Sequence, residues 1–120
     1  MPTQTQAIPN TTDVVFNGWP QEVMSANGAV TLFSGIVVIT KAGVCAMTLA
    51  APAVNDKRVL VFDSTTAQAH TLTITAGLRG AGSGADVLTW GGAIGDGITL
   101  YSYNGAWYVV PGTALNVTAG

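Results

Sequence analysis

Short apolar runs separated by turn residues follow one another along most of the chain. Residues 36–40 read Ile-Val-Val-Ile-Thr, and residues 70–75 alternate so that Leu72 and Ile74 share one face and the threonines share the other. No apolar stripe of helical spacing extends beyond two turns, so the pattern predicts strands throughout, with residues 21–26 open to either a helical turn or a short strand. The other predicted strands are residues 29–33, 44–49, 58–62, 87–90, 98–103 and 107–110.

One hairpin is predicted directly by its turn. Asn104-Gly105 lies between two β-type runs, and this pair supplies the two positive-φ residues of a type I′ turn. Tyr101 and Tyr103 enter the turn and Trp107 leaves it, so we expect aromatic side chains to pair across the two strands.

The spacing of the strands indicates the fold class. Strands recur about every 8–15 residues with turn residues between them, which is typical of sandwiches and barrels and not of βαβ units. We therefore expect an all-β fold: a small sandwich, roll or barrel of about seven to nine short strands, with an extended N-terminal arm. Residues 1–27 would form the arm and the first short strand, and residues 28–120 the β domain. No exact internal repeat is present, so a solenoid is not expected.

Composition excludes several classes of protein. Of the 120 residues, 48% are hydrophobic and only 8% are charged, which excludes disorder for most of the chain. The net charge of −2 offers no basic surface for nucleic acid. No apolar run approaches the roughly 20 residues of a membrane-spanning helix, and the N-terminus lacks the features of a signal peptide. A single cysteine, Cys45, excludes an intrachain disulfide and Cys-rich metal sites.

Residues 97–120 contain no charged side chain although they carry many aromatic and branched ones. Subunit interfaces are depleted in charge and enriched in aromatic residues, so this segment predicts an oligomer. The alternatives are a monomer with scattered apolar surface, or an aromatic platform that stacks on sugars. The predicted oligomer-interface residues are Tyr101, Tyr103, Trp107, Tyr108 and Val110.

Candidate chemistry is sparse. Asp63, Ser64 and His70 could be imagined as a triad, but Ser64 lies in a polar turn and not in a nucleophile elbow. The glycine-rich residues 77–84 lack the Gly-Lys-Ser/Thr ending of a phosphate loop. Cys45 shares a strand face with apolar neighbours, which predicts a buried, unreactive thiol. We therefore expect that this protein is not an enzyme.

The aspartates also fail to form a recognisable metal-binding pattern. Asp63, Asp86 and Asp96 are scattered and match no calcium-loop spacing, so each is expected to form turns. In the segment Gly95-Asp96-Gly97, Asp96 is expected to bond the backbone two residues on. We therefore expect no metal and no cofactor.

Four segments together resemble a known family. They are Thr48-Leu49-Ala50-Ala51-Pro52, the strand of residues 58–63, residues 69–75 with His-Thr-Leu-Thr-Ile-Thr, and residues 93–110 with Gly-Asp-Gly and Asn-Gly-Ala-Trp. This series is similar to the small β modules of tailed-bacteriophage virion proteins, which include head decoration proteins and head or tail fibre modules. The resemblance covers about residues 28–112.

The resemblance implies a homotrimer that is made in the host cytoplasm and binds the outer surface of the phage head. Its partners would be itself and the major capsid protein, with no nucleic acid and no membrane. A free chain of this length without a shaft favours decoration over a fibre tip. The alternatives are a receptor- or glycan-binding fibre or adhesin module, and a depolymerase that uses Asp63, Asp86 or Asp96. The polar arm is expected to contact the capsid through Thr3, Gln4, Thr5, Gln6, Ile8 and Pro9.

Overall fold

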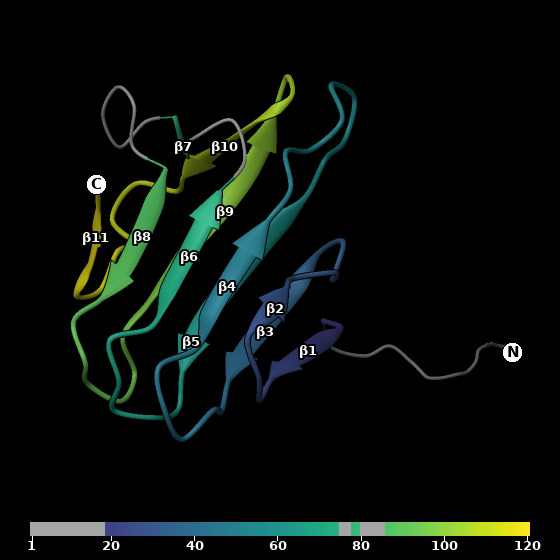
Figure 1. Cartoon of the computed structure of the whole chain (residues 1–120). Coiled ribbons are helices and arrows are strands. Elements are labelled where there is room, and N and C mark those ends of the chain that lie inside the picture. Colours follow the sequence, from purple (N-terminus) through teal and green to yellow (C-terminus); the bar gives the residue numbers. More distant parts are fainter. Residues whose placement is uncertain (1–18, 75–77, 80–85) are drawn as a thin grey trace, which may run out of the picture.

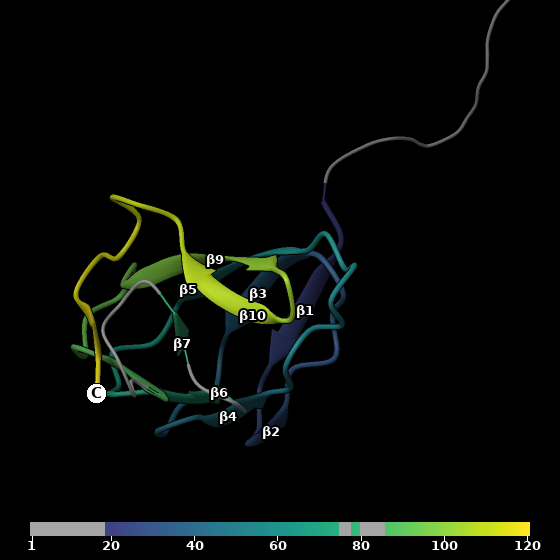
Figure 2. The same ribbon diagram turned by 90° about the horizontal axis from the view of Figure 1, so that it is seen from above.

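The computed structural model describes residues 19–74, 78–79 and 86–120, and it folds these residues into two β-sheets packed face to face (Figures 1 and 2). The prediction of an all-β sandwich-like domain is confirmed, with no helix in the described residues. Eleven strands are present in this part of the chain, more than the seven to nine expected. They are β1 (Gln21–Met24), β2 (Gly28–Ala29), β3 (Gly35–Ile39), β4 (Ala46–Leu49), β5 (Val59–Ser64), β6 (Thr71–Ile74), β7 (Leu78–Arg79), β8 (Val87–Trp90), β9 (Gly97–Tyr103), β10 (Ala106–Val109) and β11 (Val117–Ala119).

The first six strands wind in parallel between the two sheets. The six-stranded sheet, here called sheet 1, has the order β1-β3-β5-β9-β10-β7, and the five-stranded sheet 2 has the order β11-β8-β6-β4-β2. Gln21 lies opposite Ile36, and Gly35 lies opposite Leu60, in parallel pairs. This winding resembles a short solenoid, an arrangement that the absence of sequence repeats did not predict. Parallel pairing needs strands of one direction and not identical turns, so turns of unequal length hide the winding from a search for repeats.

The last strands close the sandwich with antiparallel pairs. β9 pairs with β5 and β10 in sheet 1, and β8 pairs with β6 and β11 in sheet 2. The predicted hairpin is confirmed: Tyr103 lies opposite Ala106, and Asn104 and Gly105 have φ of 52° and 82°. The last residues of sheet 2 therefore lie beside β8 and not beside the hairpin (Figure 1).

The core consists of the inward side chains of both sheets. Leu72 and Ile74 are buried as the alternation predicts, and Cys45 is buried with them. Trp90 packs edge-on against Phe62, with ring centroids 6.1 Å apart. Burying one large apolar side chain contributes about 1.5–3 kcal/mol to folding. The packed core thus holds the two sheets, and the outer faces that they carry, in a fixed arrangement.

Near the N-terminal end, the structure shortens one predicted strand and decides between the two alternatives for residues 21–26 in favour of a short strand. The strand predicted at residues 29–33 is reduced to β2, because the N–H groups of Thr31 and Leu32 donate to the Glu22 carboxylate instead of a neighbouring strand. Residues 21–24 form β1, which pairs with β3 and so belongs to the sandwich itself. The predicted N-terminal arm, residues 1 to about 16, lies outside the described residues.

Candidate functional site

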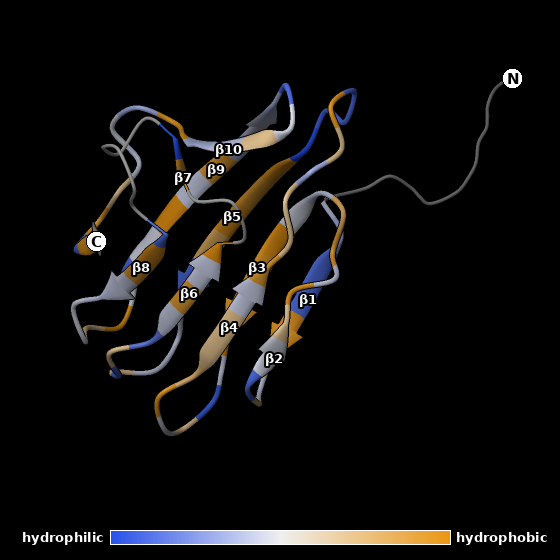
Figure 3. Ribbon diagram, turned by 45° about the horizontal axis from the view of Figure 1, so that its top comes forward, coloured by the Kyte–Doolittle hydropathy of each residue, from blue (hydrophilic) through white to orange (hydrophobic). Residues whose placement is uncertain are grey.

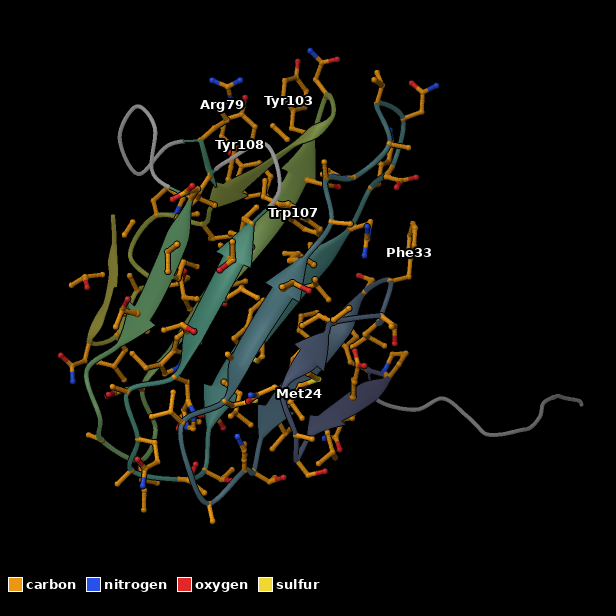
Figure 4. The ribbon with its side chains drawn as sticks, viewed as in Figure 1. Met24, Phe33, Arg79, Tyr103, Trp107 and Tyr108 are labelled. Atoms are coloured by element: carbon orange, nitrogen blue, oxygen red, sulfur yellow. The ribbon has the colours of Figure 1, made fainter. Side chains whose placement is uncertain are left out.

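Three tyrosines gather on the outer face of sheet 1 near the β9–β10 hairpin. Figure 4 labels two of them, Tyr103 and Tyr108. The rings of Tyr101 and Tyr108 stack with centroids 5.4 Å apart and an interplanar angle of 18°. Tyr103 meets Tyr108 edge-on at 6.1 Å and is 64% exposed. Tyr101, Tyr103 and Tyr108 are together called the tyrosine cluster below.

The register of sheet 1 places the cluster. Tyr101 of β9 lies opposite Tyr108 of β10, and Arg79 of β7 lies opposite Tyr108 on the other side. Because side chains alternate along a strand, all three point to the same outer face. The expected cross-strand aromatic pairing is present, but Tyr108 forms it, whereas Trp107, which was expected to take part, lies opposite Ser102. The type I′ hairpin fixes this register.

Trp107 does not belong to this surface. Its side chain is 0% exposed in the single chain, and its indole Nε1–H donates to the Ala50 carbonyl at 2.9 Å. The Arg58 guanidinium covers the ring with its carbon 4.9 Å from the centroid. Trp107 has no surface to offer a second molecule, so we remove it from the predicted interface. Val110, just past β10, is half-buried.

Arg58 is a residue whose role sequence reasoning missed. Its guanidinium also lies 4.6 Å from the Phe33 ring centroid, and it donates to the carbonyls of Phe33 and Leu32 at 2.7 and 3.1 Å. Burial lowers the pKa of this guanidinium, and nearby Asp56 partly opposes the shift. The side chain fastens the loop before β3 onto the β10 side of the core. A lone arginine before a strand carries no pattern that would reveal this contact.

A hollow of about 360 Å³ lies beside the tip of the hairpin. Tyr103 and Asn104 line it on one side, and Asn55 and Lys57 line it on the other. An exposed aromatic ring next to amide and ammonium groups is a surface on which a polar ligand could stack and form hydrogen bonds.

The imagined triad does not assemble. His70 is completely buried: its Nδ1 accepts the Cys45 N–H at 3.0 Å, and its Nε2 lies 3.0 Å from Thr66 Oγ1. Ser64 Oγ donates to the Thr66 carbonyl, and Asp63 is exposed on the opposite face of β5. Since Nδ1 is an acceptor, we assign the proton to Nε2, so both ring nitrogens are engaged in holding the fold. Burial lowers the pKa of His70.

The remaining polar candidates also have structural roles. Burial raises the pKa of the Cys45 thiol, whose Sγ contacts the Ala26 carbonyl at 3.4 Å.

The prediction that Asp96 bonds the backbone two residues ahead is wrong. Its Oδ2 accepts from the Ala93 N–H, three residues back, at 2.8 Å, and also from Asn116 Nδ2 at 3.0 Å. The bonding runs backward because the turn of residues 93–96 closes on itself, with the Asp96 N–H donating to the Ala93 carbonyl.

Asp63, Asp86 and Asp96 do not converge. Within the described residues, no group of three His, Cys, Asp or Glu side chains is arranged to hold a metal ion. The arm residues expected to contact a capsid, from Thr3 to Pro9, lie outside the described residues, as does most of the glycine-rich segment.

The part of the chain that the structure describes contains no helix long and apolar enough to cross a membrane. Comparisons with protein-family models, with curated proteins and with solved structures gave no match. The assignment of function therefore depends on the residues and their geometry.

Proposed function

We propose that this protein is a structural component of a bacteriophage virion, most specifically a homotrimeric decoration protein that binds the outer capsid surface and stabilises the shell. The observation that supports this proposal best is the tyrosine cluster, held on a rigid sheet in a segment without charge. Uncharged aromatic surfaces on rigid scaffolds are typical of protein–protein interfaces. The resemblance of residues 28–112 to phage β modules supplies the biological setting.

The mechanism is thermodynamic. A protein that binds the assembled shell and not its separated subunits stabilises the shell by mass action. Three identical contacts on one rigid trimer act at a high effective concentration, so each can be weak while the trimer holds firmly. The N-terminal arm, residues 1–16, would supply the capsid contact, and the uncharged C-terminal surface would hold the trimer together.

Deletion of residues 2–12 tests this division of labour. We expect the full chain to co-sediment with expanded capsids of the encoding phage and to raise their disruption temperature. The fraction of the deletion variant that co-sediments with capsids should be more than tenfold lower than that of the full chain, because the multivalent contact is removed. Its oligomeric mass should be unchanged.

A variant in which residues 2–12 are replaced by a Gly/Ser segment of equal length controls for chain length. Failure of the full chain to co-sediment would contradict the decoration proposal. Unchanged binding by the deletion variant would contradict only the role of the arm.

A second candidate function is glycan binding by a fibre or adhesin module. The hollow beside Tyr103 favours it, because an exposed ring with neighbouring Asn55, Lys57 and Asn104 is suited to a sugar. A glycan array with the full chain tests this function. Binding that is lost in Tyr103→Ala and kept in Thr73→Ala would support it, and an array without hits at high protein concentration would exclude it.

A further inference from the structure

The outer faces of the two sheets have opposite chemistry. Sheet 2 presents hydroxyl groups to its exterior, since Thr48, Thr73, Thr89 and Thr118 are all exposed there. At the outward strand positions of sheet 1 the exceptions are Gln21, Asp63, Thr99, Ala106 and Arg79, and the other side chains are branched apolar or aromatic. Those on the outer face of sheet 1 are Val23, Ile36, Val38, Val59, Val61, Tyr101, Tyr103 and Tyr108.

Two neighbouring strands of sheet 1, β3 and β5, have the sequence pattern of strands covered on both faces. Strands buried on both faces are apolar at nearly every position, whereas half-exposed strands alternate. β3 reads Gly-Ile-Val-Val-Ile and β5 begins Val-Leu-Val-Phe, so both are continuously apolar (Figure 3). β6 reads Thr-Leu-Thr-Ile and alternates. In the single chain, sheet 2 covers only the inner face of sheet 1 (Figure 2).

The apolar outer positions are contiguous. Cross-strand pairs join Val23 to Val38, and they join Ile36 to Val61. The next row runs from Val59 through Tyr101 to Tyr108. Asp63 ends the row of Val38 and Thr99 ends the row of Val61, so the apolar positions connect to the tyrosine cluster along β5. These side chains are mostly half-buried in the single chain, and a connected, partly exposed apolar surface of this kind is typical of an interface.

The two charged side chains on the outer face of sheet 1 favour another copy of this chain as the partner that covers it. Among the described strand residues that point outward from sheet 1, only Asp63 and Arg79 carry charge. Asp63 lies at the end of β5, and Arg79 lies on the edge strand β7, at the far side of the tyrosine cluster. A partner surface with charges of a single sign would place a like charge against either Asp63 or Arg79. Another copy of the same face carries both an arginine and an aspartate, and so offers an opposite charge to each of them.

We propose that the outer face of sheet 1 is the surface through which copies of this chain associate, with Asp63 of each copy paired to Arg79 of a neighbour. The threonine face of sheet 2 then remains on the outside of the assembly. This inference rests on the homo-oligomer of the proposed function and names the surface that builds it. It widens the sequence-based interface from the hairpin to the whole outer sheet.

The first test places one lysine on each face. Val61→Lys puts a charge at the centre of the proposed interface, and Thr73→Lys is the matched control on sheet 2. We expect light scattering after size exclusion to give the oligomeric mass for the wild type and Thr73→Lys, and a 12.2 kDa monomer for Val61→Lys. Circular dichroism checks that both variants are folded. A folded Val61→Lys oligomer, or a monomeric wild type, would overturn the inference.

Charge reversal tests the pairing without placing a charge inside the apolar surface. Asp63→Arg and Arg79→Asp each create like charges across the interface, so each should raise the concentration at which the oligomer dissociates by about tenfold. The double variant restores opposite charges and should recover the wild-type value. Equal weakening in the double variant would refute the pairing. An oligomer that behaves as expected but does not bind capsids would contradict the proposed function and leave this interface standing.

Discussion

At the scale of single residues, His70 makes folding stability dependent on pH. An unfolded histidine takes up a proton near pH 6.5, but burial lowers the pKa of His70 in the folded chain. Below pH 6.5 the unfolded state therefore binds more protons than the folded state, until the lowered pKa is reached. The contribution of His70 is complete above pH 6.5 and is lost as the pH falls below it. We expect the urea midpoint to decline between about pH 6.5 and pH 5, measured by tryptophan fluorescence.

His70→Asn provides the control, because the amide oxygen can accept the Cys45 N–H but does not titrate. This variant loses the bond to Thr66 and should be about 1 kcal/mol less stable at pH 8. Its stability should change less between pH 8 and pH 5 than that of the wild type. As His70 is the only histidine in the chain, equal slopes in the two proteins would show that it does not cause the effect.

At the scale of elements, the β9–β10 hairpin sets the register of the tyrosine cluster. Gly105 has φ of +82°, and an added Cβ would meet Val54 Cγ2 and the Pro52 carbonyl oxygen only at ordinary contact distances, so a substitution there costs backbone strain and not space. Gly105→Ala should lower the free energy of unfolding by about 1–2 kcal/mol. Gly43→Ala, where a Cβ meets nothing within 4 Å, should leave stability within about 0.5 kcal/mol or improve it. Urea titration of both variants at one protein concentration measures the difference, and equal stabilities would contradict the strain argument.

At the scale of the whole molecule, the proposed association links stability to concentration. If folded copies bind through sheet 1 and unfolded chains do not, dilution should favour unfolding by mass action. We therefore expect the Tm of the wild type to rise with chain concentration in calorimetry. The Tm of folded Val61→Lys should not change with concentration. A wild-type Tm that is independent of concentration would argue against the oligomer.

Short-range sequence patterns were sufficient to predict the fold class and most of the strands. The alternation of Leu72 and Ile74, the Asn104-Gly105 turn and the absence of helical spacing predicted the strands, the hairpin and the all-β class. These features depend on side-chain periodicity and turn chemistry, which operate over a few residues. The strand expected at residues 29–33 was shortened by the Glu22 carboxylate, which accepts from the N–H groups of Thr31 and Leu32 and belongs to another strand, β1.

The arrangement of the strands and the division of the aromatic residues depended on tertiary structure. Trp107 and Tyr108 are adjacent and equally aromatic, yet one is buried in the core and the other lies on the outer face. Nothing in residues 97–120 distinguishes them until β10 pairs with β9 and one face is turned toward sheet 2. The parallel winding of β1 to β6 likewise arises from pairings between residues far apart in the chain. Periodicity determines which residues share a face, but only the packing of the two sheets determines which face is buried.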